Sequence, residues 1–177
     1  KKELKEFIAH HNVKLVVMGL AEKNRFYKSI YGTHGVDMAG KLNAPVIIVP
    51  EEFKRHNLSH VILAIDNTQE FHQASLKEFE FLINQLDPKV DVVHFRTEQE
   101  LFNPVKKSIK LDRTNYKINE IAAKSLSSGI KRYNKTHEID LVAIIFKKHS
   151  LFYDLFAEVN THKIAISTNI PVMAIHE

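Results

Sequence analysis

The sequence predicts an α/β protein: a doubly wound, five-stranded parallel sheet with helices on both faces, preceded by half of a second unit of the same kind. Three observations support this fold class. The chain repeats itself at a distance of 126 residues. Continuous apolar runs of strand length recur along it, as is typical of strands covered on both faces. Segments of helical periodicity alternate with these runs, and such alternation builds parallel sheets with right-handed crossovers.

The repeat aligns residues 1–51 with residues 127–177 without a gap, and eleven positions are identical. Composition alone would give roughly three identities. A well-kept stretch sets Asn43 to Val46 on Asn169 to Val172. Two copies of one structural unit are therefore present.

Residues 58–126 have no upstream counterpart, so the first copy is expected only as its second half. We predict the C-terminal half of a first unit at residues 1–50 and a complete second unit at residues 58–177. The polar, proline-opened stretch between them predicts a linker at residues 51–57.

Hydrophobic periodicity, together with the capping and helix-breaking residues at element ends, places the individual helices and strands. In the first copy we expect, in chain order, a helix at 2–11, a strand at 13–20, a helix at about 32–42 and a strand at 46–49. In the second copy we expect a strand at 60–65, a helix at 69–86, a strand at 90–95, a short helix at 98–102, a strand at 116–121, a helix at 124–136 despite Gly129, a strand at 139–146, a helix at 151–167 and a strand at 171–175.

Composition limits the class of protein. With 177 residues and 44% hydrophobic residues the chain can bury a core, and with no cysteine it has neither disulfides nor thiolate metal sites. No apolar run approaches the roughly 20 residues of a membrane-spanning helix. The formal net charge of +4 is mild, and basic residues do not alternate with aromatic ones. We therefore expect a cytoplasmic protein that binds neither nucleic acid nor membrane.

Several strings resemble the universal stress protein family. VILAIDNT at 61–68 is similar to its first strand with a terminal acid, NAPVIIVP at 43–50 to the end of its last helix and its last strand, and IPVMAIHE at 170–177 to the last strand again. The resemblance covers the chain from end to end. It implies a flavodoxin-like, or adenine nucleotide alpha-hydrolase-like, fold with strand order 3-2-1-4-5.

The resemblance also implies a candidate nucleotide site. Family members that bind ATP carry a loop G-x2-G-x9-G-[ST], whose glycines let backbone amides approach phosphates and whose hydroxyl residue starts a helix. The first copy keeps this spacing as Gly19, Glu22, Gly32 and Thr33, with glutamate in place of the middle glycine. Gly19, Gly32 and Thr33 are therefore candidate cofactor-binding residues.

The second copy lacks this loop. The repeat places Ile145, Lys148, Glu158 and Val159 at the four loop positions, and none of them is glycine, serine or threonine. A side chain at a close backbone approach blocks it, and a carboxylate beside a triphosphate adds like charge. The complete unit should be a poor ATP binder.

Asp66, at the end of the expected strand 60–65, is a fourth candidate. In the resembled family the acid at this position faces the adenine or ribose of the nucleotide. The alternative is that Asp66 caps the following helix. We expect ATP or a related adenine nucleotide to bind weakly, or not at all, to the second copy and to this chain.

No metal site is expected, because the eleven histidines show neither H-x3-H nor HExxH spacing. His72, His149 and His162 form the weak alternative, a cluster near the strand ends. The string Gly32 to Gly35 resembles the family's GTHG loop but stands one loop too late. No GxSxG, Walker loop or acid pair supports catalysis.

The resemblance implies a stress-associated binding or regulatory role without defined catalysis. Two alternatives stay open: an adenine-nucleotide-dependent enzyme of the alpha-hydrolase-like group, and a purely structural dimerisation module. The family often pairs its last strands antiparallel between units, so Val46 to Val49 and Val172 to Ile175 are the expected pairing surfaces, in a second unit or in a homodimer. The outer edge of strand 13–20 should be covered by another chain or by further residues.

Overall fold

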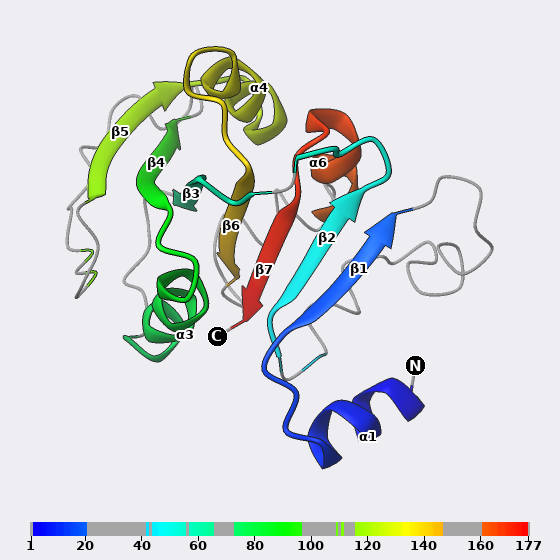
Figure 1. Ribbon diagram of the computed structural model, residues 1–177. Coiled ribbons are helices and arrows are strands. Elements are labelled where there is room, and N and C mark those ends of the chain that lie inside the picture. The colour runs from blue at the N-terminus through cyan, green and yellow to red at the C-terminus, as the bar shows by residue number, and fades with distance from the viewer. Residues whose placement is uncertain are drawn as a thin grey trace.

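A single twisted sheet organises the protein (Figure 1). The computed structural model describes residues 2–20, 42, 44–55, 57–65, 73–96, 109, 111, 116–146 and 161–176. Their strands form one seven-stranded sheet in the order β1-β2-β7-β6-β3-β4-β5. The strands are β1 (Val16–Leu20), β2 (Val46–Pro50), β3 (His60–Ile65), β4 (Lys89–Arg96), β5 (Tyr116–Ala122), β6 (Leu141–Phe146) and β7 (Val172–His176).

The predicted α/β class is confirmed, and the whole sheet is larger than five strands. Residues 58–177 contribute five parallel strands in the order β5-β4-β3-β6-β7, which is 3-2-1-4-5 when they are numbered along the chain. The first 50 residues add β1 and β2 to the same sheet. The strand count differs from the prediction because β1 and β2 join this sheet rather than forming one of their own.

The joint between the two parts is antiparallel. β1 and β2 are parallel to each other, whereas β2 runs antiparallel to β7 with Val46, Ile47 and Ile48 opposite Ala174, Met173 and Val172. These are the two strands that the sequence identified as pairing surfaces. They pair within the chain, so a homodimer, which stays a prediction, would need another edge.

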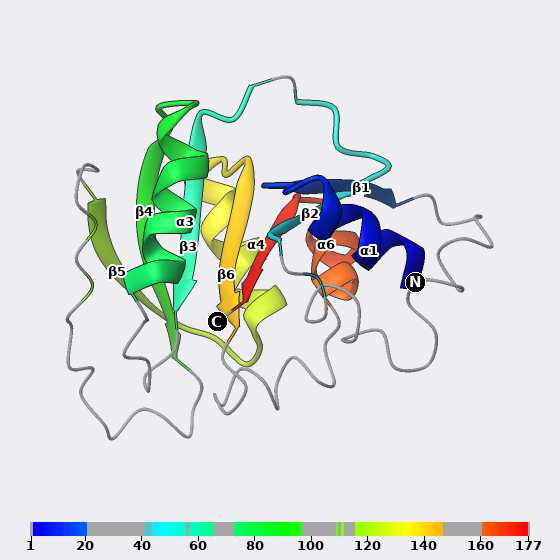
Figure 2. The ribbon, with the colours of Figure 1, turned by 90° about the horizontal axis from the view of Figure 1, so that it is seen from below.

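Helices cover both faces of the sheet. The described helices are α1 (Lys2–His10), α3 (Gln73–Asn84), α4 (Leu126–His137) and α6 (Thr161–Thr168). Ile8 of α1, Ile130 of α4 and Ile164 of α6 belong to one buried cluster, and Phe79 of α3 belongs to a cluster on the opposite face. Figure 2 shows α3 lying along β3 and β4. Strands covered on both faces explain the continuous apolar runs in the sequence.

The 126-residue repeat is matched in backbone geometry. Val16 faces Val46 in β1 and β2, and Val142 faces Val172 in β6 and β7, which is the same register 126 residues on. The N–H groups of Val16 and Val142 donate to the carbonyls of Pro45 and Pro171, each at 2.9 Å.

The helix ends match in the same way. Asn12 follows α1 with φ 49°, and Glu138 follows α4 with φ 48°. Both residues adopt the left-handed conformation that commonly ends a helix. The two copies thus share backbone detail at positions where their side chains differ.

Most of the predicted elements that fall on described residues are present, with shifted ends. The strands expected from Val13 and Ile139 begin at Val16 and Leu141, and the helix expected from Gln69 is described from Gln73. The expected helices at about 32–42 and 98–102, and the first part of the one at 151–167, lie outside the described residues, apart from Leu42, which is not helical. In the described part of the chain, no helix is long and apolar enough to cross a membrane.

Gly129 lies inside α4, where the sequence expected a helix despite it. The helix starts after Ser125, whose side chain accepts the N–H of Ser128 in a capping box. A Cβ built on Gly129 would lie 2.9 Å from Cε1 of Phe95, closer still to Cδ1, and 3.0 Å from Cβ of Ala123. The glycine is needed because α4 packs directly on the ring of Phe95 in β4.

We therefore predict that Gly129→Ala destabilises the protein. Helix propensity alone would favour alanine by about 1 kcal/mol. Overpacking against the buried Phe95 ring should cost about 1–3 kcal/mol and outweigh that gain. Urea denaturation of the variant measures the balance, with Lys131→Ala on the exposed side of α4 as the control. A Gly129→Ala protein at least as stable as the wild type would contradict the packing.

Candidate functional site

Gly19 is the candidate nucleotide-site residue that the structure describes, and it lies near the carboxyl end of β1, the end of a parallel strand at which ligands of α/β sheets bind. Gly19 stands in β1 opposite Val49, and a Cβ built on it would meet no heavy atom within 4 Å. The backbone at Gly19 is exposed, so a ligand can approach it. Gly32, Thr33 and Asp66 lie outside the described residues, as does Glu22.

The position 126 residues after Gly19 is buried rather than exposed. Ile145 occupies in β6 the place that Gly19 occupies in β1, faces Ile175, and is 1% exposed. Its side chain belongs to the core beneath α3. Lys148, Glu158 and Val159 lie outside the described residues.

The best-defined polar cluster centres on Asp91 in β4. It lies near the amino-terminal ends of β3 and β4, away from the carboxyl ends of the strands. One carboxylate oxygen, Oδ2, accepts hydrogen bonds from Tyr133 Oη at 2.8 Å and Lys89 Nζ at 2.9 Å, and faces His60 Nε2 at 2.8 Å. Asn119 donates to the Tyr133 hydroxyl at 3.3 Å. Strands β3, β4 and β5 and helix α4 thus meet at a single buried charge.

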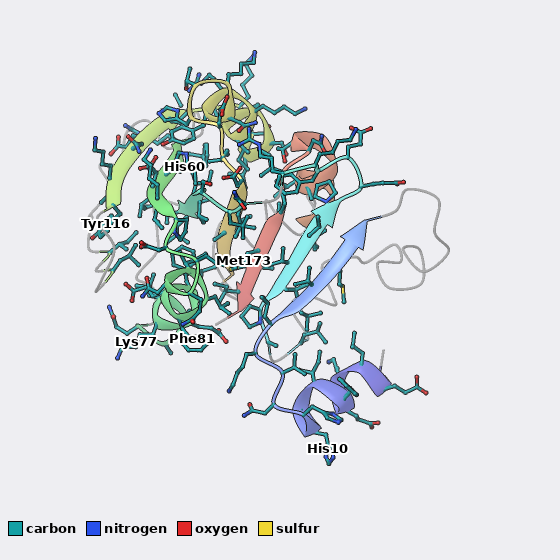
Figure 3. The ribbon with its side chains drawn as sticks, viewed as in Figure 1. His10, His60, Lys77, Phe81, Tyr116 and Met173 are labelled. Carbon is teal, nitrogen blue, oxygen red and sulfur yellow. The ribbon has the colours of Figure 1, made fainter. Side chains whose placement is uncertain are left out.

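His60 faces acceptors with both ring nitrogens. Its Nδ1 lies 2.7 Å from the carbonyl oxygen of His137, and its Nε2 lies against the Asp91 carboxylate. The Lys89 ammonium nitrogen lies 3.4 Å from the same Nε2, so both ring nitrogens of His60 contact polar groups of the protein. Figure 3 labels His60 beside β4, at the start of β3.

The cluster changes the acid–base behaviour of its members. Burial acts to raise the pKa of Asp91, but the hydrogen bonds from Lys89, Tyr133 and His60 outweigh it and hold that pKa below its usual range. Burial, followed by the hydrogen bond to Asp91 and its negative charge, raises the pKa of the Tyr133 hydroxyl. Asp91 is therefore ionised and Tyr133 is neutral at neutral pH.

A second buried carboxylate, Asp140, anchors the predicted linker. Its Oδ2 accepts the backbone N–H groups of Ser59 and His60 at 2.8 and 2.9 Å, and its Oδ1 accepts Arg55 at 2.7 Å. Arg55 also donates to the carbonyl oxygen of Glu138. The chain between β2 and β3 is thus held against the end of α4.

This arrangement is suited to holding elements together. Each polar group of the Asp91 cluster points at another member, and both ring nitrogens of His60 contact groups within the protein. No group of three metal-ligating side chains occurs among the described residues. Of the histidines considered for a metal, His72 and His149 lie outside them, and His162 is in α6.

The sequence prediction missed the Asp91 cluster, although one signal was available. Asp91 interrupts the apolar run from Val90 to Phe95, and a charge inside a buried strand requires partners. Its partners, His60 and Tyr133, stand 31 and 42 residues away in sequence. Only the strand order brings them to one point.

Comparisons with known proteins bear on the fold. No family model and no curated protein match the sequence. A universal stress protein from Archaeoglobus fulgidus superposes with a TM-score of 0.62 over 99% of this chain, at 13% identity. The fold is that of universal stress proteins.

Two structures from Pseudomonas aeruginosa are similar to the same degree. One, of unknown function, has a TM-score of 0.59 at 12% identity, over 99% of this chain and 67% of its own. The other, provisionally named a universal stress protein, has a TM-score of 0.59 at 11% identity, over 98% of this chain and 66% of its own. This chain spans 64% of the length of the Archaeoglobus protein.

Asp91→Asn should destabilise the protein by about 3 kcal/mol at neutral pH, because it leaves His60, Lys89 and Tyr133 around a group without charge. Because the Asp91 pKa is lower in the folded protein than in the unfolded chain, ionised Asp91 stabilises the fold above about pH 4. This contribution is lost as the pH falls through the folded value.

Urea unfolding between neutral and acidic pH measures both effects. The difference in stability between wild type and Asp91→Asn should shrink as the pH falls. Asp87→Asn, an exposed change at a left-handed position that asparagine tolerates, is the control. A difference that stays constant with pH would show that the Asp91 charge does not stabilise the fold.

Proposed function

We propose that this protein is a two-copy, universal-stress-protein-like protein of the cytoplasm with a stress-associated binding or regulatory role and no catalysis of its own. The shared fold supports the proposal, as do the equal registers and equal helix ends of the two copies. In this interpretation residues 1–50 are the C-terminal half of the first unit, 51–57 the linker and 58–177 the second unit.

We propose further that adenine nucleotide binding, where it occurs, belongs to the first copy. A single contrast carries this proposal. At Gly19 the backbone faces open space, whereas the matching position in the second copy holds Ile145, whose side chain is buried in the core. Phosphate loops need backbone amides that a ligand can reach, and an isoleucine there prevents this. Gly19, Gly32 and Thr33 are the candidate residues of the first copy, and Asp66 is the corresponding candidate of the second copy.

A structural pairing role is the second candidate, and the joint between β2 and β7 favours it. The edge of β7, the last strand of the second unit, pairs with β2 of the first. Pairing covers two strand edges that would otherwise be exposed to other chains. In this role the second unit would be a scaffold for the first.

Calorimetric titration with Mg-ATP tests where nucleotide binds. We expect the 177-residue chain to bind ATP only with a dissociation constant above about 100 µM. The first copy lacks its first strand here, and the second lacks the glycine loop. Micromolar binding would contradict the assignment of a degenerate second site.

Glu22→Gly restores the middle glycine of the first loop and removes a carboxylate. We expect it to strengthen ATP binding about tenfold, a change of about 1.4 kcal/mol. Glu51→Gly, an exposed change at the start of the linker, is the matched control for the lost charge. Equal binding by wild type and Glu22→Gly would refute the idea that Glu22 blocks the loop.

A further inference from the structure

We propose that α1 and β1 form a docking surface for a β-α-β unit of the β3–α3–β4 type. We further propose that Glu3 and Phe7 select the occupant. It should carry a small residue where β4 has Phe95 and an apolar residue where β4 has Asp91. The proposal rests on the two-copy organisation proposed above.

Side-chain exposure in the two copies locates this surface. Phe7 in α1 is 55% exposed, whereas its counterpart Tyr133 in α4 is 3% exposed. Val17 in β1 is 61% exposed, and its counterpart Ala143 in β6 is 0% exposed. The exposed positions of the first copy are positions that the second copy buries.

The strand edges differ between the copies in the same way. β6 pairs with β7 on one side and with β3 on the other, where Val142 faces Ile62. β1 pairs with β2 in the register of β6 and β7, and no described strand pairs with its other edge. A parallel strand equivalent to β3 fits that edge.

The contacts that hold Phe7 in α1 match those that hold Tyr133 in α4. The His11 ring stacks on Phe7 at 4.1 Å, and the His137 ring stacks on Tyr133 at 3.9 Å. His11 Nδ1 contacts the Phe7 carbonyl at 3.0 Å, as His137 Nδ1 contacts that of Tyr133 at 3.1 Å. The ring at position 7 is therefore already held in the orientation that meets β4 in the second copy.

Phe7 sets the first requirement on the occupant. In the second copy the Tyr133 hydroxyl donates to Asp91, which is 2% exposed. Phe7 has no hydroxyl, so a carboxylate at the Asp91 position of the occupant would be buried against a phenyl ring with one donor fewer. Burying a charge without its partners is costly, which favours an apolar residue there.

Glu3 sets the second requirement. It is the counterpart of Gly129, where an added Cβ would lie within 3 Å of the Phe95 ring. Glu3 has a Cβ, so a phenylalanine at the Phe95 position of the occupant would overlap with it. A small side chain there removes the overlap.

A second copy of this chain is a poor occupant by the same criteria. Its β3 and β4 are already paired with each other and with neighbours on both sides, and they carry Asp91 and Phe95. A unit equivalent to residues 58–125 fits the surface better, because in the second copy that segment lies next to α4, the counterpart of α1.

The experiment extends the 177-residue protein at its N-terminus by a copy of residues 58–126 fused directly to Lys1. One version of the added copy is unchanged, and the other carries Asp91→Val and Phe95→Ala. We expect the substituted copy to raise the melting temperature by at least about 5 °C and to slow hydrogen exchange of the β1 amides. The unchanged copy should do so less.

A reciprocal variant of the 177-residue protein completes the test. With Glu3→Gly and Phe7→Tyr in residues 1–177, the preference should reverse, and the unchanged copy should stabilise more. No stabilisation and no protection of β1 by either copy would overturn the docking surface. If the unchanged and the substituted copy stabilise the wild-type protein and the variant equally, Glu3 and Phe7 do not select the occupant. ATP titration is a separate measurement, so failure of the nucleotide proposal can be distinguished from failure of the docking surface.

Discussion

The antiparallel contact between β2 and β7 is the constraint on which the rest of the structure depends. Three residue pairs, from Val46–Ala174 to Ile48–Val172, turn two pieces of chain into one sheet. Both buried clusters cross this joint: Ile48 and Val172 lie in one, Ile47 and Met173 in the other. Without the joint, the two-stranded pair of β1 and β2 would have neither a core of its own nor a covered edge.

The fold could be predicted largely because burial on both faces forces a continuous apolar run, as in Val61 to Ile65, and because the repeat fixed the register. The polar site could not be predicted, since it depends on which strands become neighbours. Asp91, His60 and Tyr133 meet only because β3 and β4 lie side by side beneath α4. The need for glycine at position 129 likewise follows only from the Phe95 ring that packs against it.

Residues 1–51 and 127–177 show that a backbone arrangement can recur while the side chains on it differ. Backbone features such as the left-handed residues Asn12 and Glu138 are the same in both copies. Side chains at matching positions differ where a ligand or a neighbour would meet them, as at Gly19 and Ile145. A fold therefore identifies the scaffold, and function has to be argued from the residues placed on it.

An engineered disulfide across the β2–β7 joint tests the central claim most directly, because the protein has no cysteine of its own. Ile47 and Met173 are directly opposite, and antiparallel partners have Cα atoms about 4.5–5.5 Å apart, which suits a disulfide. Ile47→Cys with Met173→Cys should oxidise rapidly to a cross-linked monomer, whereas Ile47→Cys with Ile175→Cys, two residues out of register, should not. A covalent dimer, or thiols that stay free, would contradict a joint made within one chain.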